Sequence, residues 1–181
     1  SDLAVYKSIE KDLKSTSGIM NLNTCNDFEQ IASYIGSLNI EHSSPQGINT
    51  DNVLLGSTFI VGGQIKGQQH ELYLVYPQGN YIRPADSKPY LVIGEVKYGK
   101  PILDRVIKPD VSIGDASRCA LISMDSTLKS DLTVGPPIDF AVLKKDADKL
   151  SSLECLNVTD ETYSKVCNQW SDGIFKVFDS F

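Results

Sequence analysis

Glu95 is the first residue whose type and position point to chemistry. It follows the apolar run Tyr90–Ile93 and Gly94, so its carboxylate is expected at the end of a strand. A carboxylate at a strand end can position an amine or a lysine during proton transfer. The alternative is a solvated loop residue or an ion pair with Lys97 or Lys100, and the residues taken alone favour this second interpretation.

Asp131 is the second candidate carboxylate. It comes after Lys129 and Ser130, in the loop that follows a predicted helix. There it could orient the amine of a nucleophile. It suits equally well a turn in which an aspartate side chain accepts a hydrogen bond from the backbone two residues on. Both interpretations stay open from the residues alone.

Other sets of reactive residues are less promising. Glu95, Asp104 and Asp115 would be the acidic groups of a carboxylate-dependent metal enzyme, the weakest of the functions considered, and no bound metal is expected. His42 and His70 both fall in segments predicted to be polar loops. Neither has a partner at catalytic spacing, so a Ser/His/Asp triad or a histidine metal pair is not expected.

The composition restricts the class of protein. The 181 residues are enough for one domain, and 41% are hydrophobic. The formal net charge is −6 and the lysines and arginines are scattered, which argues against nucleic-acid binding. The chain has no apolar run long enough for a membrane span and no CxxC pair. A cytoplasmic protein with no cofactor is expected, with reduced thiols at Cys25, Cys119, Cys155 and Cys167.

Apolar periodicity predicts two helices followed by a block of strands. The first helix is already under way at Leu3, so an upstream part is expected to be missing. The second is expected to have Asn26 as its N-cap, with Glu29 as the capping-box partner. A surface loop at 42–52 comes next. Four strands are then expected in an antiparallel meander: Thr58–Val61, Glu71–Tyr76, Tyr81–Arg83 and Tyr90–Ile93.

Helices return in the second half of the chain. One is expected over Tyr98–Val106 and a longer one from about Ser112, with small residues on one face. A strand at Ile138–Leu143 precedes a last helix at Asp160–Trp170, and Ile174–Phe178 is expected as a final strand or turn. A block of strands flanked by helices indicates an α+β layered fold.

Three segments carry a resemblance to a known family: 57–65, 93–105 and 125–139. In this order and at similar spacing, they resemble the bacterial proteasome-type subunits called Anbu, or ancestral β-subunit. The middle segment, IGEVKYGKPILDR, is the most specific because it is long and rich in unusual neighbours. The resemblance covers roughly residues 1–146.

This resemblance implies a four-layer αββα sandwich of the N-terminal-nucleophile hydrolase type. Residues 1–181 would form a single proteasome-subunit-like domain that lacks its leading strands. Such subunits assemble with copies of themselves into rings or spirals and cleave peptides or unfolded proteins. The nucleophile is an N-terminal threonine whose own α-amine serves as general base, helped by a lysine and an aspartate.

Several positions of the present chain match or depart from the family pattern. The chain begins with Ser1, which opens a helix and is not taken as the nucleophile, so the family's threonine, lysine and nearest aspartate have no counterpart here. Asp131 and Gly135 match an aspartate and a glycine of the active-site loops. Glu95 and Val134 stand where serines are expected. The resemblance therefore assigns Glu95, Asp131 and Gly135 to the active-site loops.

Two functions follow from the resemblance. The first is a threonine-type endopeptidase subunit, for which the chain as given lacks the nucleophile and is expected to be inactive. The second is a non-catalytic structural subunit of a proteasome-like assembly, which the departures at Glu95 and Val134 keep open. Catalysis by the first would require that the loops around Glu95 and Asp131 converge.

Overall fold

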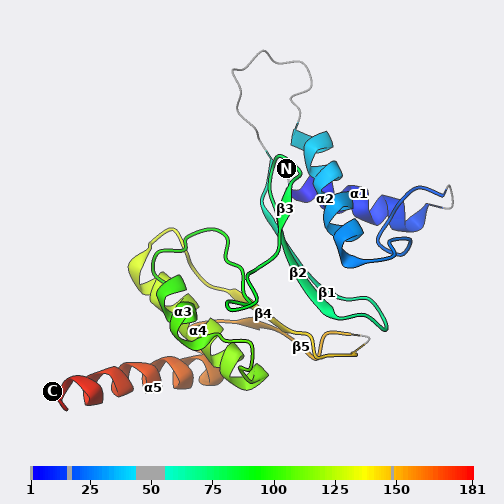
Figure 1. Cartoon of the computed structure of the whole chain (residues 1–181). Helices are drawn as coiled ribbons and strands as arrows, with labels where there is room; N and C mark the ends of the chain where they lie inside the picture. The colour runs from blue at the N-terminus through cyan, green and yellow to red at the C-terminus, as the bar shows by residue number, and fades with distance from the viewer. Residues whose placement is uncertain (1, 16–17, 44–55, 148) are drawn as a thin grey trace. The chain divides into compact units, whose positions relative to one another are not determined.

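The computed structural model describes residues 2–15, 18–43, 56–147 and 149–181 (Figure 1). It divides the chain into two compact units, Ser1–Pro84 and Ala85–Phe181. Each unit has its own helices and its own antiparallel sheet. Ser1 and most of the loop predicted at 42–52 lie outside the described residues.

In the first unit one helix packs on a three-stranded sheet and a second helix packs on the first. Its helices are α1 (Asp2–Lys14) and α2 (Phe28–Ser43). Its strands pair antiparallel in the order β1-β2-β3, which confirms the predicted meander for three of its four members. The strands are β1 (Phe59–Gln64), β2 (His70–Val75) and β3 (Tyr81–Ile82).

Helix α2 covers one face of this sheet, and residues on the other face are exposed. The side chains of Phe59, Val61, Tyr73 and Val75 belong to the core beneath α2. Because side chains alternate along a strand, their neighbours point to the other face, where Ile60 and Ile82 are exposed. The sheet is therefore apolar on both faces, as expected of a buried layer rather than a solvated one.

Helix α2 begins one residue later than the sequence indicated. Asp27, not Asn26, caps it, since the Gln30 backbone N–H donates to Asp27 Oδ1 at 2.8 Å. The Gln30 side chain in turn accepts from the Asn26 backbone N–H at 3.0 Å. A carboxylate is the stronger acceptor at the positive end of a helix, which explains why the aspartate takes the cap position.

Asn39 holds α2 to the ends of the sheet. It is almost fully buried, and its Nδ2 donates to the carbonyl oxygens of Ser57 at 2.6 Å and Tyr76 at 3.1 Å. Its Oδ1 accepts from the Ser57 backbone N–H at 3.2 Å. One amide thus satisfies backbone groups on both sides of the β1–β2 hairpin, where no strand partner reaches them.

The second unit has three helices and a two-stranded hairpin. The helices are α3 (Lys100–Val106), α4 (Ile113–Ser130) and α5 (Glu161–Phe178). The strands β4 (Ile138–Val142) and β5 (Ser152–Leu156) pair antiparallel. The core between hairpin and helices comprises Leu121, Ile138, Leu156, Tyr163 and Cys167. On the other face of the hairpin, Leu153 is exposed.

Two expectations for this half of the chain are wrong, and one strand was not predicted. Tyr90–Ile93 is extended but pairs with no strand among the described residues. Strand β5 was not foreseen, because its polar residues hide the alternating pattern. Ile174–Phe178 is neither strand nor turn but the last part of α5, because the apolar spacing of that helix continues beyond Trp170.

A buried polar group joins α4 to α5. The Tyr163 hydroxyl donates to Asp125 Oδ1 at 3.3 Å, and Lys129 Nζ lies 2.7 Å from Asp125 Oδ2. Burial of the Tyr163 side chain, together with the charge of this carboxylate, raises the pKa of Tyr163. Lys129 thus balances the negative charge of the buried Asp125, and the Tyr163 hydroxyl donates a hydrogen bond to it.

All four cysteines lie among the described residues, and each is a free thiol. In the part of the chain that the structure describes, no helix combines the length and the apolar character that crossing a membrane requires. His42 lies in the last turn of α2, not in a loop, and its Nε2 is 2.8 Å from Ser8 Oγ of α1.

Replacing Asn39 with Ala should destabilise the protein by about 2–4 kcal/mol, since two carbonyls and one N–H lose a buried partner. Urea unfolding followed by circular dichroism measures this loss. Gln78→Ala, a change at an exposed turn residue nearby, should stay within about 0.5 kcal/mol of the parent. Equal stabilities for the two variants would contradict the role given to Asn39.

Candidate functional site

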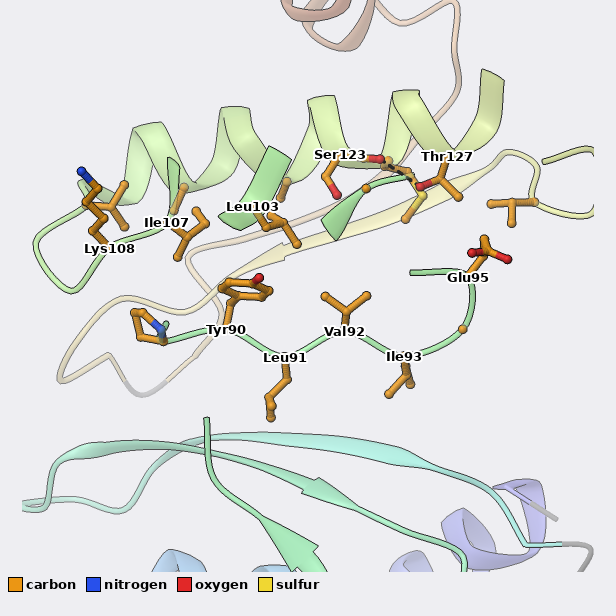
Figure 2. A pocket seen from close by; sticks show the side chains of 18 of the residues that line it. Tyr90, Leu91, Val92, Ile93, Glu95, Leu103, Ile107, Lys108, Ser123 and Thr127 are labelled. Atoms are coloured by element: carbon orange, nitrogen blue, oxygen red, sulfur yellow. Dashed lines mark hydrogen bonds between the residues drawn. The ribbon is translucent and has the colours of Figure 1, made fainter. Parts of the chain in front are cut away.

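The second unit contains a cavity of about 620 Å³. One wall is the extended segment from Pro89 to Glu95, and the other is formed by α3 and α4. Figure 2 shows Tyr90 and Val92 directed toward the helices, whereas Leu91 and Ile93 point the opposite way. The lining is mostly apolar, with a lysine, Lys108, at one end and a carboxylate, Glu95, at the other (Figure 2).

The extended wall is attached to α3 through Asp104. The Tyr90 hydroxyl donates to Asp104 Oδ1 at 2.8 Å. Lys88 Nζ lies 2.6 Å from the same oxygen, and Lys100 Nζ lies 2.6 Å from Oδ2. Hydrogen bonds from Lys100, Lys88 and Tyr90 hold the pKa of Asp104 well below its usual range. Side chains thus fix this segment where sheet hydrogen bonds do not.

Gly99 sets the distance between α3 and α4. It is buried just before α3, and a Cβ built on it would meet the Ser123 carbonyl oxygen at 2.9 Å and Thr127 Oγ1 at 3.1 Å. No larger side chain fits without moving one of these helices. The Thr127 hydroxyl donates back to the Ser123 carbonyl at 3.0 Å, and both residues line the cavity (Figure 2).

Glu95 lies at the end of the cavity nearest the end of α4. Gly94 precedes it with φ 80°, a conformation that glycine adopts without strain, and the chain turns sharply there. Glu95 Oε1 accepts a hydrogen bond from the backbone N–H of Lys97 at 2.8 Å. The carboxylate is therefore held by its own loop and leaves its second oxygen available.

Asp131 is the C-cap of α4. Its Oδ1 accepts from the Thr133 N–H at 2.8 Å and from the Thr133 hydroxyl at 2.7 Å, which is the Asx-type interaction that the sequence left open. The Thr133 hydrogen bonds lower the pKa of Asp131, and the positive charge of Lys97 lowers it further. Lys97 belongs to the Glu95 loop, so the two loops lie within electrostatic reach of each other.

Of the three residues assigned to active-site loops, only Glu95 lines the cavity. Asp131 lies in the loop whose Val134 lines the same cavity. Gly135 is exposed and is not part of the lining. The hydroxyls of Ser123 and Thr127 were missed as site groups; the small-residue face of α4 was the signal that another element approaches closely there.

The three acidic residues of the metal-enzyme alternative are each engaged separately. Asp104 is bound by two lysines and Tyr90, whereas Asp115 accepts from the Ser112 hydroxyl and pairs with Arg118. In the described residues, no three His, Cys, Asp or Glu side chains gather in a way that could hold a metal ion. This alternative therefore gains no support from the geometry.

Comparison with known proteins identifies close structural relatives. No family model matches the chain, and no curated protein matches it. Among solved structures, the Anbu (Gly-1) mutant from Hyphomicrobium sp. strain MC1 is similar, with 36% identity and a TM-score of 0.86 over 99% of this chain and 74% of that one.

Two further solved structures of Anbu proteins are also similar to this chain. Anbu (ancestral beta-subunit) from Yersinia bercovieri is 32% identical, with a TM-score of 0.88, covering 99% of this chain and 76% of its own. Anbu from Pseudomonas aeruginosa, in a structure described as a helical assembly of the Anbu complex, is 34% identical, with a TM-score of 0.83 over 99% and 74% of the two chains.

Replacing Asp104 with Asn should release the extended wall, because Tyr90 and two lysines lose their common anion. The melting temperature should fall at pH 7. The pKa of Tyr90, which burial and the Asp104 hydrogen bond raise, should fall toward its ordinary value in a spectrophotometric titration. Asp110→Asn, at an exposed turn residue, is the matched control and should change neither quantity.

The difference between the parent and Asp104→Asn should depend on pH in a defined direction. The folded-state pKa of Asp104 is lowered, so its stabilisation is complete above the unfolded pKa of about 3.9 and is lost as the pH falls toward the folded value. The two melting temperatures should therefore approach each other below about pH 4. A gap that stays constant down to pH 2 would exclude Asp104 as its source.

Proposed function

Because the chain belongs to the Anbu, or ancestral β-subunit, family of proteasome-related proteins, we propose that it is part of a threonine-type endopeptidase subunit. The nucleophile in this proposal is an N-terminal threonine, which is not among residues 1–181. The residues of this chain would supply the loops around that threonine. The proposed chemistry needs no metal and no cofactor.

The proposed reaction proceeds in two steps. The threonine Oγ attacks the peptide carbonyl carbon while the α-amine of the same residue takes the hydroxyl proton. The carbon–nitrogen bond breaks, the leaving amine receives that proton, and an ester remains on the threonine. Water then attacks the ester, the released proton returns to the threonine oxygen through the same amine, and the second product leaves as a carboxylate.

One observation supports this proposal best: the Gly94–Lys97 loop and the loop that ends α4 meet at one end of the cavity. Each loop carries a carboxylate, Glu95 in the first and Asp131 in the second, and the positive charge of Lys97 in the first loop lowers the pKa of Asp131. An α-amine acting as base must be held by acceptors in a fixed orientation. We assign that positioning role to Asp131, with Glu95 as the second acceptor.

Gly135 has a different part in the proposal. It follows Val134 on the exposed side of the same loop, and an added Cβ there would meet nothing within 4 Å. The residue therefore leaves backbone accessible beside the cavity, where an N–H can approach a developing oxyanion.

For the architecture, we propose a single domain with four layers, helices–sheet–sheet–helices. The support comes from the elements of each unit. In the first unit, helices cover one face of a sheet that is apolar on both faces. In the second unit, α4 and α5 pack on one face of the β4–β5 hairpin. On each sheet, the face that points away from the helices of the same unit is left uncovered by them. Stacking two such sheets completes the burial of both.

For partners, we propose copies of the same chain and, as substrate, peptides or unfolded protein segments. The Pseudomonas aeruginosa relative is described as a helical assembly, and this is the support for self-assembly into a ring or spiral. The apolar lining of the cavity suits side chains of an extended peptide better than a charged small molecule.

One set of observations favours a second function, that of a non-catalytic structural subunit. Both candidate carboxylates already accept hydrogen bonds within their own loops, Glu95 from Lys97 and Asp131 from Thr133. Val134 also brings no hydroxyl to the site. These groups would then stabilise loops in an assembly and never contact a substrate.

A covalent probe distinguishes these functions. The complete gene product is incubated with a peptide epoxyketone, which needs a hydroxyl and a free α-amine on one residue to form its stable adduct. We expect a mass increase of one probe on an N-terminal threonine, located by tandem mass spectrometry. Asp131→Asn should slow this labelling by about 10²-fold or more, because the amine loses its acceptor.

Two matched variants control for general damage. Asp86→Asn makes the same chemical change as Asp131→Asn at an exposed position, and Glu41→Gln removes another exposed carboxylate. Both variants should label at the parent rate. Absence of any adduct, or an N-terminus without threonine, would reject the peptidase and leave the structural subunit. Labelling that Asp131→Asn leaves unchanged would reject the role of that residue alone.

A further inference from the structure

The loop that follows α4 holds the Asp131 side chain with more bonds than a turn requires. Asp131 Oδ1 accepts two hydrogen bonds, from the backbone N–H of Thr133 at 2.8 Å and from the Thr133 hydroxyl at 2.7 Å. The N–H bond alone closes the turn, since an aspartate turn needs only one bond to the backbone two residues on. The hydroxyl bond is therefore additional, and it acts on the carboxylate more than on the backbone.

The backbone of Asp131 is fixed independently of these two bonds. Its N–H donates to the Thr127 carbonyl at 2.9 Å, and its carbonyl accepts from the Val134 N–H at 3.3 Å. What remains is rotation about the torsions of the side chain, and the terminal torsion of an aspartate has only a broad, roughly twofold preference. Two donors on one oxygen restrict that rotation, so they determine where the other oxygen points.

The second oxygen, Oδ2, is the one left for a bound group. Among the described residues, both hydrogen bonds that the Asp131 side chain accepts go to Oδ1. An ionised carboxylate has lone pairs for further donors and forms a stronger bond with an amine than a neutral acceptor does. The Thr133 hydrogen bonds and the positive charge of Lys97 lower the pKa of Asp131, so the carboxylate is ionised at neutral pH.

Glu95 provides a contrast within the same site. Its Oε1 accepts one hydrogen bond from its own loop, from the Lys97 N–H at 2.8 Å, and its side chain has one more rotatable bond than that of an aspartate. Glu95 can therefore adjust to a bound group, whereas the shorter, doubly bonded side chain of Asp131 is held in place. A rigid acceptor is the better partner for an amine that must keep one orientation.

Thr133 is the one residue of the loop 131–135 that carries a hydroxyl. The neighbouring Val134 lines the cavity and brings none. Thr133 is itself exposed, so its side chain is not needed to fill a core. The role of this threonine is therefore to be sought in the bond between its hydroxyl and Asp131.

We propose that Thr133 is a positioning residue of the proposed peptidase, whose hydroxyl fixes the Asp131 carboxylate so that Oδ2 accepts from the α-amine of the nucleophile. The inference rests on the proposed function and adds a residue to it. Thr133 acts through Asp131 and has no contact of its own with the substrate. Without the hydroxyl the carboxylate can turn, and the amine loses a fixed acceptor while the loop backbone stays as it is.

The first test measures epoxyketone labelling of the complete gene product. Thr133→Val removes the hydroxyl at nearly constant shape and should slow labelling about tenfold, less than Asp131→Asn because the N–H bond to Oδ1 remains. Thr133→Ser restores the hydroxyl and should label within about twofold of the parent. Thr24→Val is the matched control, since it removes an exposed turn hydroxyl of the first unit, and should label at the parent rate.

The second test is a double-mutant cycle, which a general loss of structure does not imitate. The double variant Asp131→Asn, Thr133→Val should label within about twofold of Asp131→Asn alone, because the carboxylate that the hydroxyl orients is already absent. A hydroxyl that only stabilised the loop would slow both backgrounds by the same factor. The melting temperature of each variant checks that the folded fraction is unchanged.

The outcomes separate this role from the proposal on which it rests. Slower labelling of Thr133→Val, restored by Thr133→Ser and absent from the Asp131→Asn background, supports the positioning role. Labelling of Thr133→Val at the parent rate, or equal slowing in both backgrounds, overturns this role and leaves the peptidase in place. A parent protein that forms no adduct overturns the peptidase and this role together.

Discussion

The bond between Tyr90 and Asp104 is the constraint on which the second unit's cavity depends. Tyr90–Ile93 has the composition of a strand yet no strand beside it in the described residues. Its backbone therefore lacks the ladder that normally fixes such a segment. The Asp104 carboxylate replaces that ladder at one point, with Lys88 and Lys100 balancing its charge. We therefore expect loss of this carboxylate to loosen the wall against α3.

The other end of the same wall, at Gly94 and Glu95, carries the charged groups of the candidate site. Once Tyr90 is fixed, Gly94 turns the chain and delivers Glu95 and Lys97 to the end of α4. Asp131 is then close enough for the charge of Lys97 to act on its pKa. Both carboxylates rest on hydrogen-bond donors of their own loops. Binding an amine would add a donor to oxygens that have lone pairs left, so it need not break the loops.

The sequence predicted correctly those elements whose structure is determined by nearby residues. The α4 helix and the β1–β2 hairpin were predicted because their apolar periodicity and turns are local signals. Tyr90–Ile93 was wrong as a strand, since pairing depends on a neighbour that its own residues do not specify. The length of α5 was missed because an apolar row that continues without a core reads as the start of a different element.

For the candidate site, too, the local features were predictable from the sequence and the packing between elements was not. Gly94 before Glu95, and a helix end before Asp131, are local features, and both carboxylates lie where these features put them. That the two loops converge on one catalytic site is implied only by the family resemblance and stays a prediction. The positions of the Ser123 and Thr127 hydroxyls depend on how closely α4 packs against Gly99, and the small-residue face of α4 indicated a close approach without saying which element makes it.

A common physical pattern links the remaining surfaces of both units. The sheet of the first unit exposes Ile60 and Ile82, the hairpin of the second exposes Leu153, and α5 exposes Phe178. Each is the uncovered side of an element whose other side is buried. Exposed apolar surface costs about 25 cal/mol per Å² relative to burial, so contiguous uncovered faces favour further association. This shared pattern is the physical basis for proposing further layers over these faces.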